Sequence, residues 1–347
     1  MQTHTALLGK NLRELEKLVT SYGEPKFRGR QIAEWLYHKG ATDISEMTNL
    51  PLHFRETLSR DFELGRSEII GRQISKDGTE KYLYPVHGMP DKSIETVYIP
   101  ENDRATLCIS SQVGCKMNCY FCMTGRMGFH GNLSAGDIIN QLLTAPHADK
   151  LTNVVFMGMG EPLDNYDQVA KVLEILTAPW GLAWSPKRIT VSTVGPKRGL
   201  LRFLEEQQAH LAISIHNPFP EERLAMMPVE KAFPITEVID TLKQYDFSGQ
   251  RRLSFEYILF AGVNDSREHA AALVRLLSPL DCRVNLIRYH ALPDSDLSAP
   301  RAETIQRFED YLNSHGLRCT TRRSRGEDIF AACGMLSTTH TDATSRP

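Results

Sequence analysis

The chain has 347 residues, 41% of them hydrophobic, a length typical of about two domains that can bury a sizeable core without disulfides. Its 40 basic and 42 acidic residues leave a net charge of −2, which excludes a global nucleic-acid signature. No apolar run approaches the roughly 20 residues that cross a bilayer, and residues 1–10 lack the apolar stretch of a signal peptide. We therefore expect a cytoplasmic protein without membrane contact.

Residues 1–66 are expected to form a helical accessory domain. Apolar residues recur at helical spacing from Leu12 to Val19, the segment RGRQIAEWLYHKG ends near Gly40, and Pro51 opens a further helix. Two local basic patches stand out on this otherwise neutral chain, one at Lys26, Arg28 and Arg30 and one at Arg318, Arg322, Arg323 and Arg325. Most such runs are solvated faces, but local patches can supply phosphate contacts, so charge alone leaves nucleic-acid binding open.

Residues 67–104 are expected to form a small β extension. The segments KYLYPV and IETVYIP are rich in β-formers, and HGMPDK between them is typical of a turn. Glu95 in IETVYIP alternates outward on its strand, so the pattern alone predicts a surface residue.

Residues 105–335 alternate between strand-like and helix-like segments. The strand candidates are ATLCIS, NVVFMG, RITVSTV, HLAISIH, LSFEYILF and RVNLIRY. Six strands with helix-length crossovers predict an α/β fold with a parallel sheet covered by helices. An open or partial (β/α)6 barrel fits this count better than a full eightfold barrel, and a doubly wound sheet is the alternative. The polar residues 336–347 are expected to form a flexible tail.

Four of the seven cysteines fall in one short segment, a pattern that indicates a metal or catalytic site rather than a disulfide framework. The motif CKMNCYFC places Cys115, Cys119 and Cys122 in the loop after the first strand of the alternating region. Three thiolates can hold a [4Fe-4S] cluster with one iron left open for S-adenosylmethionine (SAM), which radical enzymes bind through its amino and carboxylate groups. A structural zinc site usually needs a second cysteine pair, which the sequence lacks. The spacing therefore predicts a radical SAM enzyme, with a structural zinc site as the competing interpretation.

Polar and glycine residues follow several predicted strands where a (β/α) barrel has its active site. They are Gly158, Gly160 and Glu161 after the second strand, Ser192 at the end of the third, Ser214 and His216 at the fourth, and His290 at the sixth. Glycines at 158 and 160 would let the backbone approach a cofactor closely. The segment GMGEP is thus a candidate site for the amino group of SAM.

The sequence resembles the RlmN/Cfr adenosine methyltransferases over nearly its whole length. The matching blocks are FRGRQIAEWLYHKG, EMTNLP, IETVYIP, LCISSQVGCKMNCYFCMTG, GMGEPLDN, VSTVG, LAISIH and RGEDIFAACG. The resemblance implies a partial radical SAM barrel with a helical N-terminal domain, and methylation of an adenine carbon in RNA. The expected substrate is C2 of an adenosine in the peptidyl-transferase loop of 23S rRNA, and some members also modify a tRNA adenosine beside the anticodon. Cfr-type methylation of C8, which gives antibiotic resistance, is the alternative.

The resemblance also implies a mechanism with two SAM molecules per turnover and two cysteines outside the cluster. Cys333 in AACG corresponds to the methyl-bearing residue, Cys108 to the residue that resolves the protein–RNA link, and Glu95 to the acid–base residue. The electron donor would be a flavodoxin or ferredoxin, and the protein would be a monomer.

The cofactor contacts implied by the resemblance fall on Gly160, Glu161, Ser192, Ser214, Ile215, His216 and His290. His290 stands in NLIRYH, where the family usually has Asn. Without the resemblance, Cys108 and Cys333 could be ordinary buried cysteines, but the small-residue loop after a basic run favours an exposed, activated thiol at Cys333. Cys282 and Cys319 lie in no motif and are expected to be structural.

Overall fold

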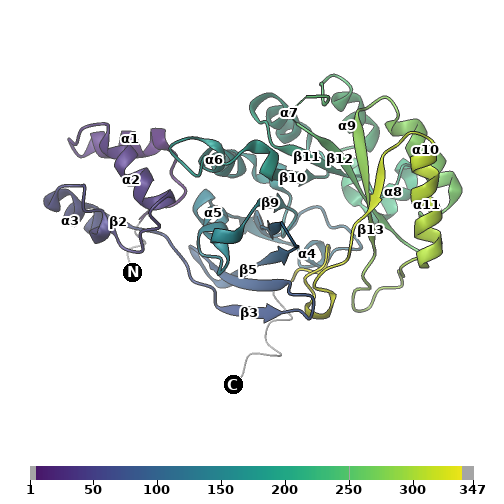
Figure 1. Cartoon of the computed structure of the whole chain (residues 1–347), viewed down its shortest axis with the longest axis horizontal. Coiled ribbons are helices and arrows are strands. Elements are labelled where there is room, and N and C mark those ends of the chain that lie inside the picture. The colour runs from purple at the N-terminus through teal and green to yellow at the C-terminus, as the bar shows by residue number, and fades with distance from the viewer. Residues whose placement is uncertain (1–4, 250, 338–347) are drawn as a thin grey trace.

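A single mixed sheet runs through the body of the protein in the computed structural model, which describes residues 5–249 and 251–337 (Figure 1). Its strands lie in the order β14-β13-β12-β11-β10-β9-β6-β5-β4-β3. The parallel part consists of β6 (Ala105–Cys108), β9 (Asn153–Phe156), β10 (Ile189–Thr193), β11 (His210–Ser214), β12 (Leu253–Leu259), β13 (Cys282–Arg288) and β14 (Cys319–Thr321).

The parallel strands follow one another in space as they do in the sequence, without the reversal of strand order that defines a doubly wound sheet. The prediction of a partial barrel is therefore confirmed, and the doubly wound alternative is wrong. All six predicted strands are present. The short edge strand β14 was missed, because it has only three residues and two of them, Thr320 and Thr321, are exposed.

The β extension continues the same sheet instead of forming a separate unit. Its strands β3 (Gly71–Ile74), β4 (Glu80–Val86) and β5 (Met89–Pro100) are antiparallel, and β5 pairs with β6. The predicted boundary at residue 104 thus falls between β5 and β6, two strands that are hydrogen-bonded to each other. That a domain ends there stays a prediction.

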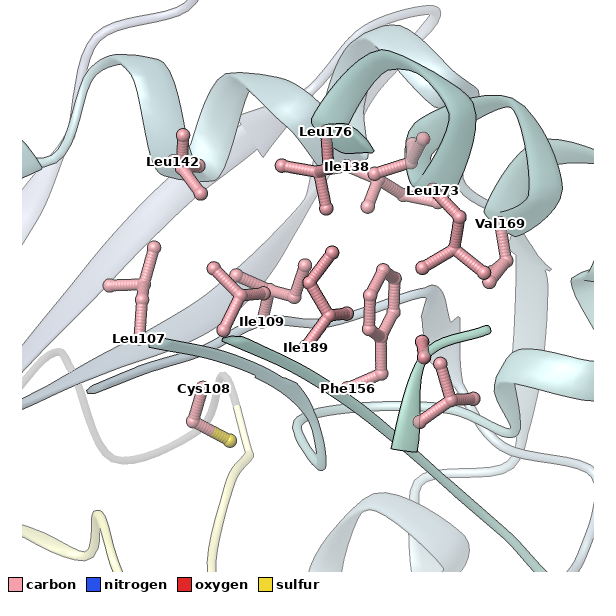
Figure 2. Packing of buried hydrophobic residues seen from close by; sticks show 14 of the residues in the cluster. Leu107, Cys108, Ile109, Ile138, Leu142, Phe156, Val169, Leu173, Leu176 and Ile189 are labelled. Atoms are coloured by element: carbon pink, nitrogen blue, oxygen red, sulfur yellow. The ribbon is translucent and has the colours of Figure 1, made fainter. Parts of the chain in front are cut away.

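Amphipathic helices connect the parallel strands and cover one face of the sheet. They are α5 (Ala135–Leu143), α6 (Tyr166–Thr177), α7 (Lys197–Glu206), α9 (Ile235–Leu242), α10 (Arg267–Leu277) and α11 (Ala302–Ser314). The short helix α8 (Pro220–Met226) packs instead at the cysteine loop, where the carbonyl of Met226 accepts from the N–H of Tyr120 at 2.9 Å. Figure 2 shows Ile138, Leu142 and Leu173 of these helices above Leu107 and Phe156 of the strands. Burial of this apolar surface is the main force that holds helices and sheet together.

Successive side chains of a strand point to opposite faces, and this alternation separates Leu107 from Cys108. Leu107 points into the hydrophobic cluster, whereas the sulfur of Cys108 points to the other face, toward the C-terminal segment (Figure 2). The face of the sheet that carries Cys108 is therefore the face on which the site is built.

The predicted N-terminal helical module is present and contains α1 (Leu12–Ser21), α2 (Arg28–Tyr37) and α3 (Leu52–Asp61). A capping box at Asn11 begins α1, and the strands β1 (Thr5–Ala6) and β2 (Phe62–Glu63) pair across the ends of the module. The Asn11 amide donates to Glu174 of α6 at 2.9 Å. This module lies at the end of the molecule opposite α10 and α11 (Figure 1).

The remaining elements are short. They comprise a two-stranded ribbon of β7 (Gln112–Gly114) and β8 (Phe129–Asn132), the helix α4 (Met123–Arg126), and 3-10 turns at Ile44–Glu46, Ala148–Lys150, Pro162–Asn165, Pro186–Arg188, Pro228–Lys231 and Glu327–Ile329. Among the described residues, no helix has the length and apolar character needed to cross a membrane.

The predicted flexible tail does not begin at residue 336. Leu336 and Ser337 are both buried, so the prediction is wrong for these two residues, and residues 338–347 lie outside the described part of the chain. The segment before them therefore packs against the body of the protein, with consequences for the site.

Candidate active site

A cavity opens at the carboxyl ends of the parallel strands, where barrel enzymes place their active sites. It encloses about 790 Å³ of empty space, part of it open to solvent. Among its lining residues are Cys115, Cys119, Cys122, Gly158, Gly160, Glu161, Ser192, Ser214, His216, Glu256 and Cys333. The structure thus brings most of the predicted site residues together, from strand ends and loops far apart in the sequence.

The cysteine triad lies in the loop between β7 and α4, and all three thiols are free and half-buried. Cys122 begins α4 as its N-cap, and the backbone N–H of Cys122 donates to the carbonyl of Cys119 at 3.1 Å. Burial raises the pKa of Cys115 to about 12. Burial also raises the pKa of Cys119, with the neighbouring thiols acting in the same direction and Arg223 against them.

These thiols fit an iron–sulfur cluster better than a single ion. In residues 5–249 and 251–337, no three His, Cys, Asp or Glu side chains gather closely enough to hold one metal ion, as a zinc ion with bonds of about 2.3 Å to sulfur would require. The three cysteines instead line the wall of a shared cavity. A cubane cluster binds its thiolates at separate irons, so ligands spread around a space suit it.

Arg223 is a buried charged residue beside the site that the sequence did not reveal. Its side chain is fully buried and forms an ion pair with Glu230. The guanidinium donates to the carbonyls of Ile215 at 2.9 Å and Ser214 at 3.1 Å. It therefore fixes the end of β11 and places a positive charge near Cys119.

Glu161 is buried just beyond the carboxyl end of β9, the second parallel strand. Its carboxylate accepts hydrogen bonds from the Thr193 hydroxyl at 2.6 Å and from the backbone N–H groups of Val194 and Leu163, each at 2.9 Å. Burial raises the pKa of Glu161 to about 7, against these donors. Because a carboxylate can accept about four hydrogen bonds, Glu161 can still accept one from a donor in the cavity, such as an amino group.

The two glycines of GMGEP line the cavity, but close packing of protein against protein explains them. A Cβ on Gly158 would lie 2.7 Å from the carbonyl oxygen of Ile109, and one on Gly160, whose φ is +100°, would lie 2.5 Å from Gln112 Cβ. Contact with neighbouring protein atoms is therefore enough to require glycine at both positions, and the expected reason, close approach of the backbone to a cofactor, is not needed to explain them.

His216 presents a neutral imidazole to the cavity. Its Nδ1 accepts a hydrogen bond from the backbone N–H of Ile258 at 3.1 Å, which assigns the ring proton to Nε2. Burial lowers the pKa of His216 to about 3, with Arg223 acting in the same direction. Ile215 beside it is fully buried and does not line the cavity, so only its backbone could meet a cofactor.

A second cavity of about 1210 Å³, part of it open to solvent, lies beside the first. Because several arginines line it, we call it the arginine-lined cavity. Its lining includes Glu101, Arg104, Thr190, Asn285, His290, Arg322, Arg323, Arg325 and Cys333. His290 belongs to this cavity and not to the first, and its Nδ1 lies 3.2 Å from Glu327 Oε1. Cys333 lines both cavities and stands at their junction.

The residues of the two predicted basic patches differ in whether acidic side chains pair with them. Lys26 is 3.1 Å from Glu16, Arg28 is paired with Glu24, and Arg318 pairs with Asp281 away from the cavities. The arginines at 322, 323 and 325 lie around the second cavity together with Arg104, and of these Arg322 is paired with Glu256 at 3.5 Å.

Cys333 is an exposed residue, as predicted, but protein atoms surround its sulfur, and the pKa of its thiol is raised where an activated thiol would have a lowered one. Burial by the surrounding protein raises the pKa of Cys333, and Arg322 opposes this shift while Glu256 adds to it. Cys108 is buried, and burial raises its pKa to about 12, with Cys333 acting in the same direction. The charge of Arg322 acts on both thiols, which places it close to the pair.

Glu95 is not the surface residue that strand alternation predicted. Its side chain is 0% exposed, its Oε1 lies 3.0 Å from Lys81 Nζ, and its Oε2 accepts the backbone N–H of Ser337 at 2.8 Å. It lines neither cavity. The prediction failed because the C-terminal segment covers this part of the sheet.

Glu256 is a further buried carboxylate, and it was not among the predicted site residues. Its Oε1 accepts from the Asn285 amide at 2.7 Å, whereas its Oε2 has no hydrogen-bond partner among the residues that the structure describes. A lone acidic residue inside the apolar strand LSFEYILF was the available signal, because a charge in such a run needs a reason.

The thiol environments predict an order of chemical modification in the anaerobic, cluster-loaded protein. We expect iodoacetamide to modify exposed Cys333 before buried Cys108. Because burial raises the pKa of Cys333, its modification rate should still be rising above about pH 8.5, the ordinary pKa of a cysteine. Arg322→Ala should slow the reaction and Glu256→Gln should speed it, as peptide mass spectrometry would measure. Equal rates in both variants would show that neither charge acts on this thiol.

Comparison with known proteins defines the class to which this fold and site belong. Residues 109–274 match the radical SAM superfamily, and residues 5–64 match the ribosomal RNA large subunit methyltransferase N-terminal domain. A crystal structure of a radical SAM methyltransferase from Sphaerobacter thermophilus has a TM-score of 0.89 and 40% identity, covering 96% of this chain and 99% of that one. The protein is a radical SAM enzyme, a class whose members use SAM and a [4Fe-4S] cluster.

Curated relatives identify the family within that class. The probable dual-specificity RNA methyltransferase RlmN of Phocaeicola vulgatus is 60% identical over 336 residues, covering 96% of this chain and 95% of the relative. The dual-specificity RNA methyltransferase RlmN of Pseudomonas entomophila is 39% identical over 351 residues, covering 98% and 92%. This chain belongs to the RlmN family, which confirms the predicted resemblance.

Proposed function

We propose that this protein methylates C2 of an adenosine in the peptidyl-transferase loop of 23S rRNA, and a tRNA adenosine next to the anticodon, in the cytoplasm. The observation that carries the proposal is the position of Cys333, whose side chain lines both the cavity of the cysteine triad and the arginine-lined cavity. A methyl group on this sulfur would face the cofactor on one side and a nucleotide on the other. The name of the relatives, dual-specificity RNA methyltransferase, supports two RNA substrates.

The residues of the first cavity are proposed to hold the cofactors. Cys115, Cys119 and Cys122 would bind three irons, and Glu161 with the backbone at Gly160 would receive the amino group of SAM. Ser192, Ser214, the backbone of Ile215 and the Nε2–H of His216 would complete the contacts. The bound cluster and SAM supply a carbon-centred radical by one-electron cleavage, with a flavodoxin or ferredoxin as electron donor. His290 has no such role in this proposal, because it lines the other cavity.

Radical chemistry is needed because C2 of adenine is an electron-poor carbon that cannot attack a methyl donor. The thiolate of Cys333 would first take a methyl group from one SAM. A second SAM per turnover would then serve to remove a hydrogen atom from that methyl group, and the resulting carbon would add to C2. The adduct would then lose the C2 proton and one electron, which the cluster could take back, and the aromatic ring would be restored. The thiolate of Cys108 would finally attack the sulfur of Cys333 and break the carbon–sulfur bond. The freed carbon would take up a proton to become the methyl group of the product, and the disulfide left behind needs two electrons for the next turnover.

The arginine-lined cavity is proposed as the entrance for the target nucleotide. Arg104, Arg323 and Arg325 can meet phosphates, the usual way in which a protein positions RNA. The target base would be splayed out of its stack toward Cys333, as enzymes that modify bases require. We propose a monomer as the active form, since the two cavities are built from one chain.

Nucleoside mass spectrometry tests the proposal. Digested 23S rRNA and tRNA from cells without the protein should lack 2-methyladenosine, and the purified cluster-loaded protein with SAM and a reductant should restore it. Retention time separates this product from 8-methyladenosine of equal mass. The 8-methyl product would replace the proposal with Cfr-type C8 methylation, and unmodified adenosine in both RNAs would contradict it altogether.

A further inference from the structure

We propose that Glu256 is the proton acceptor for Cys333 when this cysteine receives its methyl group from SAM. The inference rests on the proposed function in one respect, the role of Cys333 as the methyl-bearing residue. It concerns only the first methyl transfer, before any RNA is needed, and it gives a catalytic role to a carboxylate that was not among the predicted site residues.

The carboxylate of Glu256 is held by only one of its two oxygens. Its Oε1 accepts from the Asn285 amide at 2.7 Å and from the Ser254 hydroxyl at 3.1 Å, and it lies 3.5 Å from Arg322 Nη2. Its Oε2 is buried and has no hydrogen-bond partner among the described residues, although the whole residue is only 3% exposed. A buried polar atom without a partner costs free energy, so it calls for an explanation such as a catalytic role.

Glu256 lines the first cavity, called the cofactor cavity from here on, and Cys333 is fixed on the wall of the same cavity. The segment around Cys333 is tied down on both sides. Before it, the Asp328 carboxylate accepts from the Ser75 hydroxyl at 2.5 Å, and after it, the Gly334 carbonyl accepts from the N–H of residue 123 at 2.8 Å. The thiol is therefore held beside the space proposed for the methyl donor, on a wall that also carries the unpartnered oxygen.

The Cys333 thiol must lose its proton before its sulfur can attack a methyl group, because the thiolate is the nucleophile. Burial raises the pKa of Cys333, and among charged side chains Arg322 and Glu256 have the largest further effects, in opposite directions. Arg322 cannot take the proton, since a guanidinium has no acceptor atom. Glu256 is then the group acting on this thiol that can receive the proton, directly or through one water molecule.

The other candidate acceptors near Cys333 are engaged or lie elsewhere. His216 accepts a backbone N–H through Nδ1 and carries its ring proton on Nε2, so neither nitrogen is a free acceptor. Glu161 already accepts three hydrogen bonds and is proposed to receive the amino group of SAM. Glu101 and His290 line the arginine-lined cavity and not the one proposed for the methyl donor. Glu256 therefore remains.

The proposed step is balanced within the chain and its methyl donor. The proton passes from the sulfur of Cys333 to Oε2 of Glu256, and the electron pair left on the sulfur forms the new bond to the methyl carbon. The bond between that carbon and the sulfonium sulfur of SAM breaks, and its electron pair stays on the departing S-adenosylhomocysteine. No electron enters or leaves, and the products are methyl-Cys333 and a protonated Glu256.

The pH dependence of two reactions of Cys333 in the unaltered protein tests the assignment. The cluster-loaded protein, shown by peptide mass spectrometry to begin with unmethylated Cys333, is given SAM anaerobically without RNA. An internal base should make methyl-Cys333 formation nearly independent of pH from about pH 7 to about pH 8.5, because the proton passes within the pair. Iodoacetamide modification without SAM should keep rising over the same range, since it uses thiolate formed by exchange with solvent. Methylation that rises in parallel with iodoacetamide modification would overturn the role of Glu256.

Glu256→Gln provides the second test, because it keeps an amide oxygen for the Asn285 and Ser254 donors but cannot take a proton. Its formation of methyl-Cys333 at about pH 7.5 should be at least about a hundredfold slower than in the unaltered protein, the scale of a lost general base. Iodoacetamide should modify Cys333 at least as fast as before, since the negative charge that opposes the thiolate is gone. A purely electrostatic role would speed both reactions, and that outcome would contradict the proposal.

Glu80→Gln is the matched control for this variant. Glu80 is also buried and paired with an arginine, Arg72, at 2.7 Å, but it lies on β4 outside both cavities, so its replacement should leave both rates unchanged. Iron content reports whether each variant is intact, and the pH comparison in the unaltered protein decides the question even where Glu256→Gln does not fold. Absence of methyl-Cys333 in the unaltered protein would instead contradict the proposed function, so the two failures are distinguishable.

Discussion

Replacing Cys333 by Ala is expected to lower RNA methylation by at least about a thousandfold, to background, while the iron and sulfide content stays that of the unaltered protein. Cys333 is the cysteine that lines both cavities. The three cysteines of the triad line only the first cavity, and Cys108 is buried on β6. No other free thiol among the described residues is placed to carry a methyl group to the arginine-lined side. Nucleoside mass spectrometry of treated RNA, alongside iron analysis of the protein, would measure both effects.

Cys282→Ala is the matched control for this variant. Its thiol is buried at the beginning of β13, outside both cavities, so its loss should reduce stability slightly and leave methylation unchanged. Retention of methylation by Cys333→Ala would show that the two-cysteine mechanism is wrong for this protein, whatever the cluster does.

The parallel strands and their site could be predicted because both follow from local patterns. Each predicted strand is a short apolar run between helix-length crossovers, and the carboxyl ends of parallel strands share one edge. The strand pattern alone therefore places Glu161, Ser192 and Ser214 at one edge of the sheet, and all three line the cofactor cavity. The same pattern could not reveal β14, since a three-residue strand with two exposed threonines leaves no apolar run.

The direction and cover of individual side chains could not be predicted from the same patterns. His290 follows β13 at the expected edge of the sheet, yet it lines the arginine-lined cavity. The order of the strands predicts the edge at which a residue lies, but not the direction in which its side chain points. Glu95 alternates outward as predicted, but outward means exposed only where nothing packs against that face. The covering residue, Ser337, lies 242 positions away, so no window of sequence around Glu95 contains the reason for its burial.

The same long-range packing explains why Cys333 lies near enough to Cys108 to raise the pKa of its thiol. Cys108 points away from the helix-covered core because of strand alternation (Figure 2), and the segment tied by Asp328 and Gly334 brings Cys333 over that face. Arg322 is close enough to act on both thiols. Neither thiol alone would indicate a pair, since each is separately compatible with a structural cysteine.

Replacing Cys108 by Ala is therefore expected to trap the RNA on the protein through Cys333. Without the second thiol, nothing breaks the bond between the Cys333 methylene carbon and its sulfur after that carbon has joined the adenine. Cys108→Ala removes a single sulfur atom from a buried site, so the loss of stability should be small, and the variant should still bind its cluster and methylate Cys333. Denaturing gel electrophoresis should show a slow band that contains both RNA and protein and that disappears on nuclease digestion.

The double variant Cys108→Ala with Cys333→Ala separates this outcome from non-specific crosslinking. It lacks the sulfur through which the link would form, so the slow band should be absent, although the cluster and the arginine-lined cavity are retained. Release of free methylated RNA by Cys108→Ala at the rate of the unaltered protein would show that another group resolves the intermediate. Persistence of the band in the double variant would show that the link does not involve Cys333, and would contradict the assignment of the methyl-bearing residue at the same time.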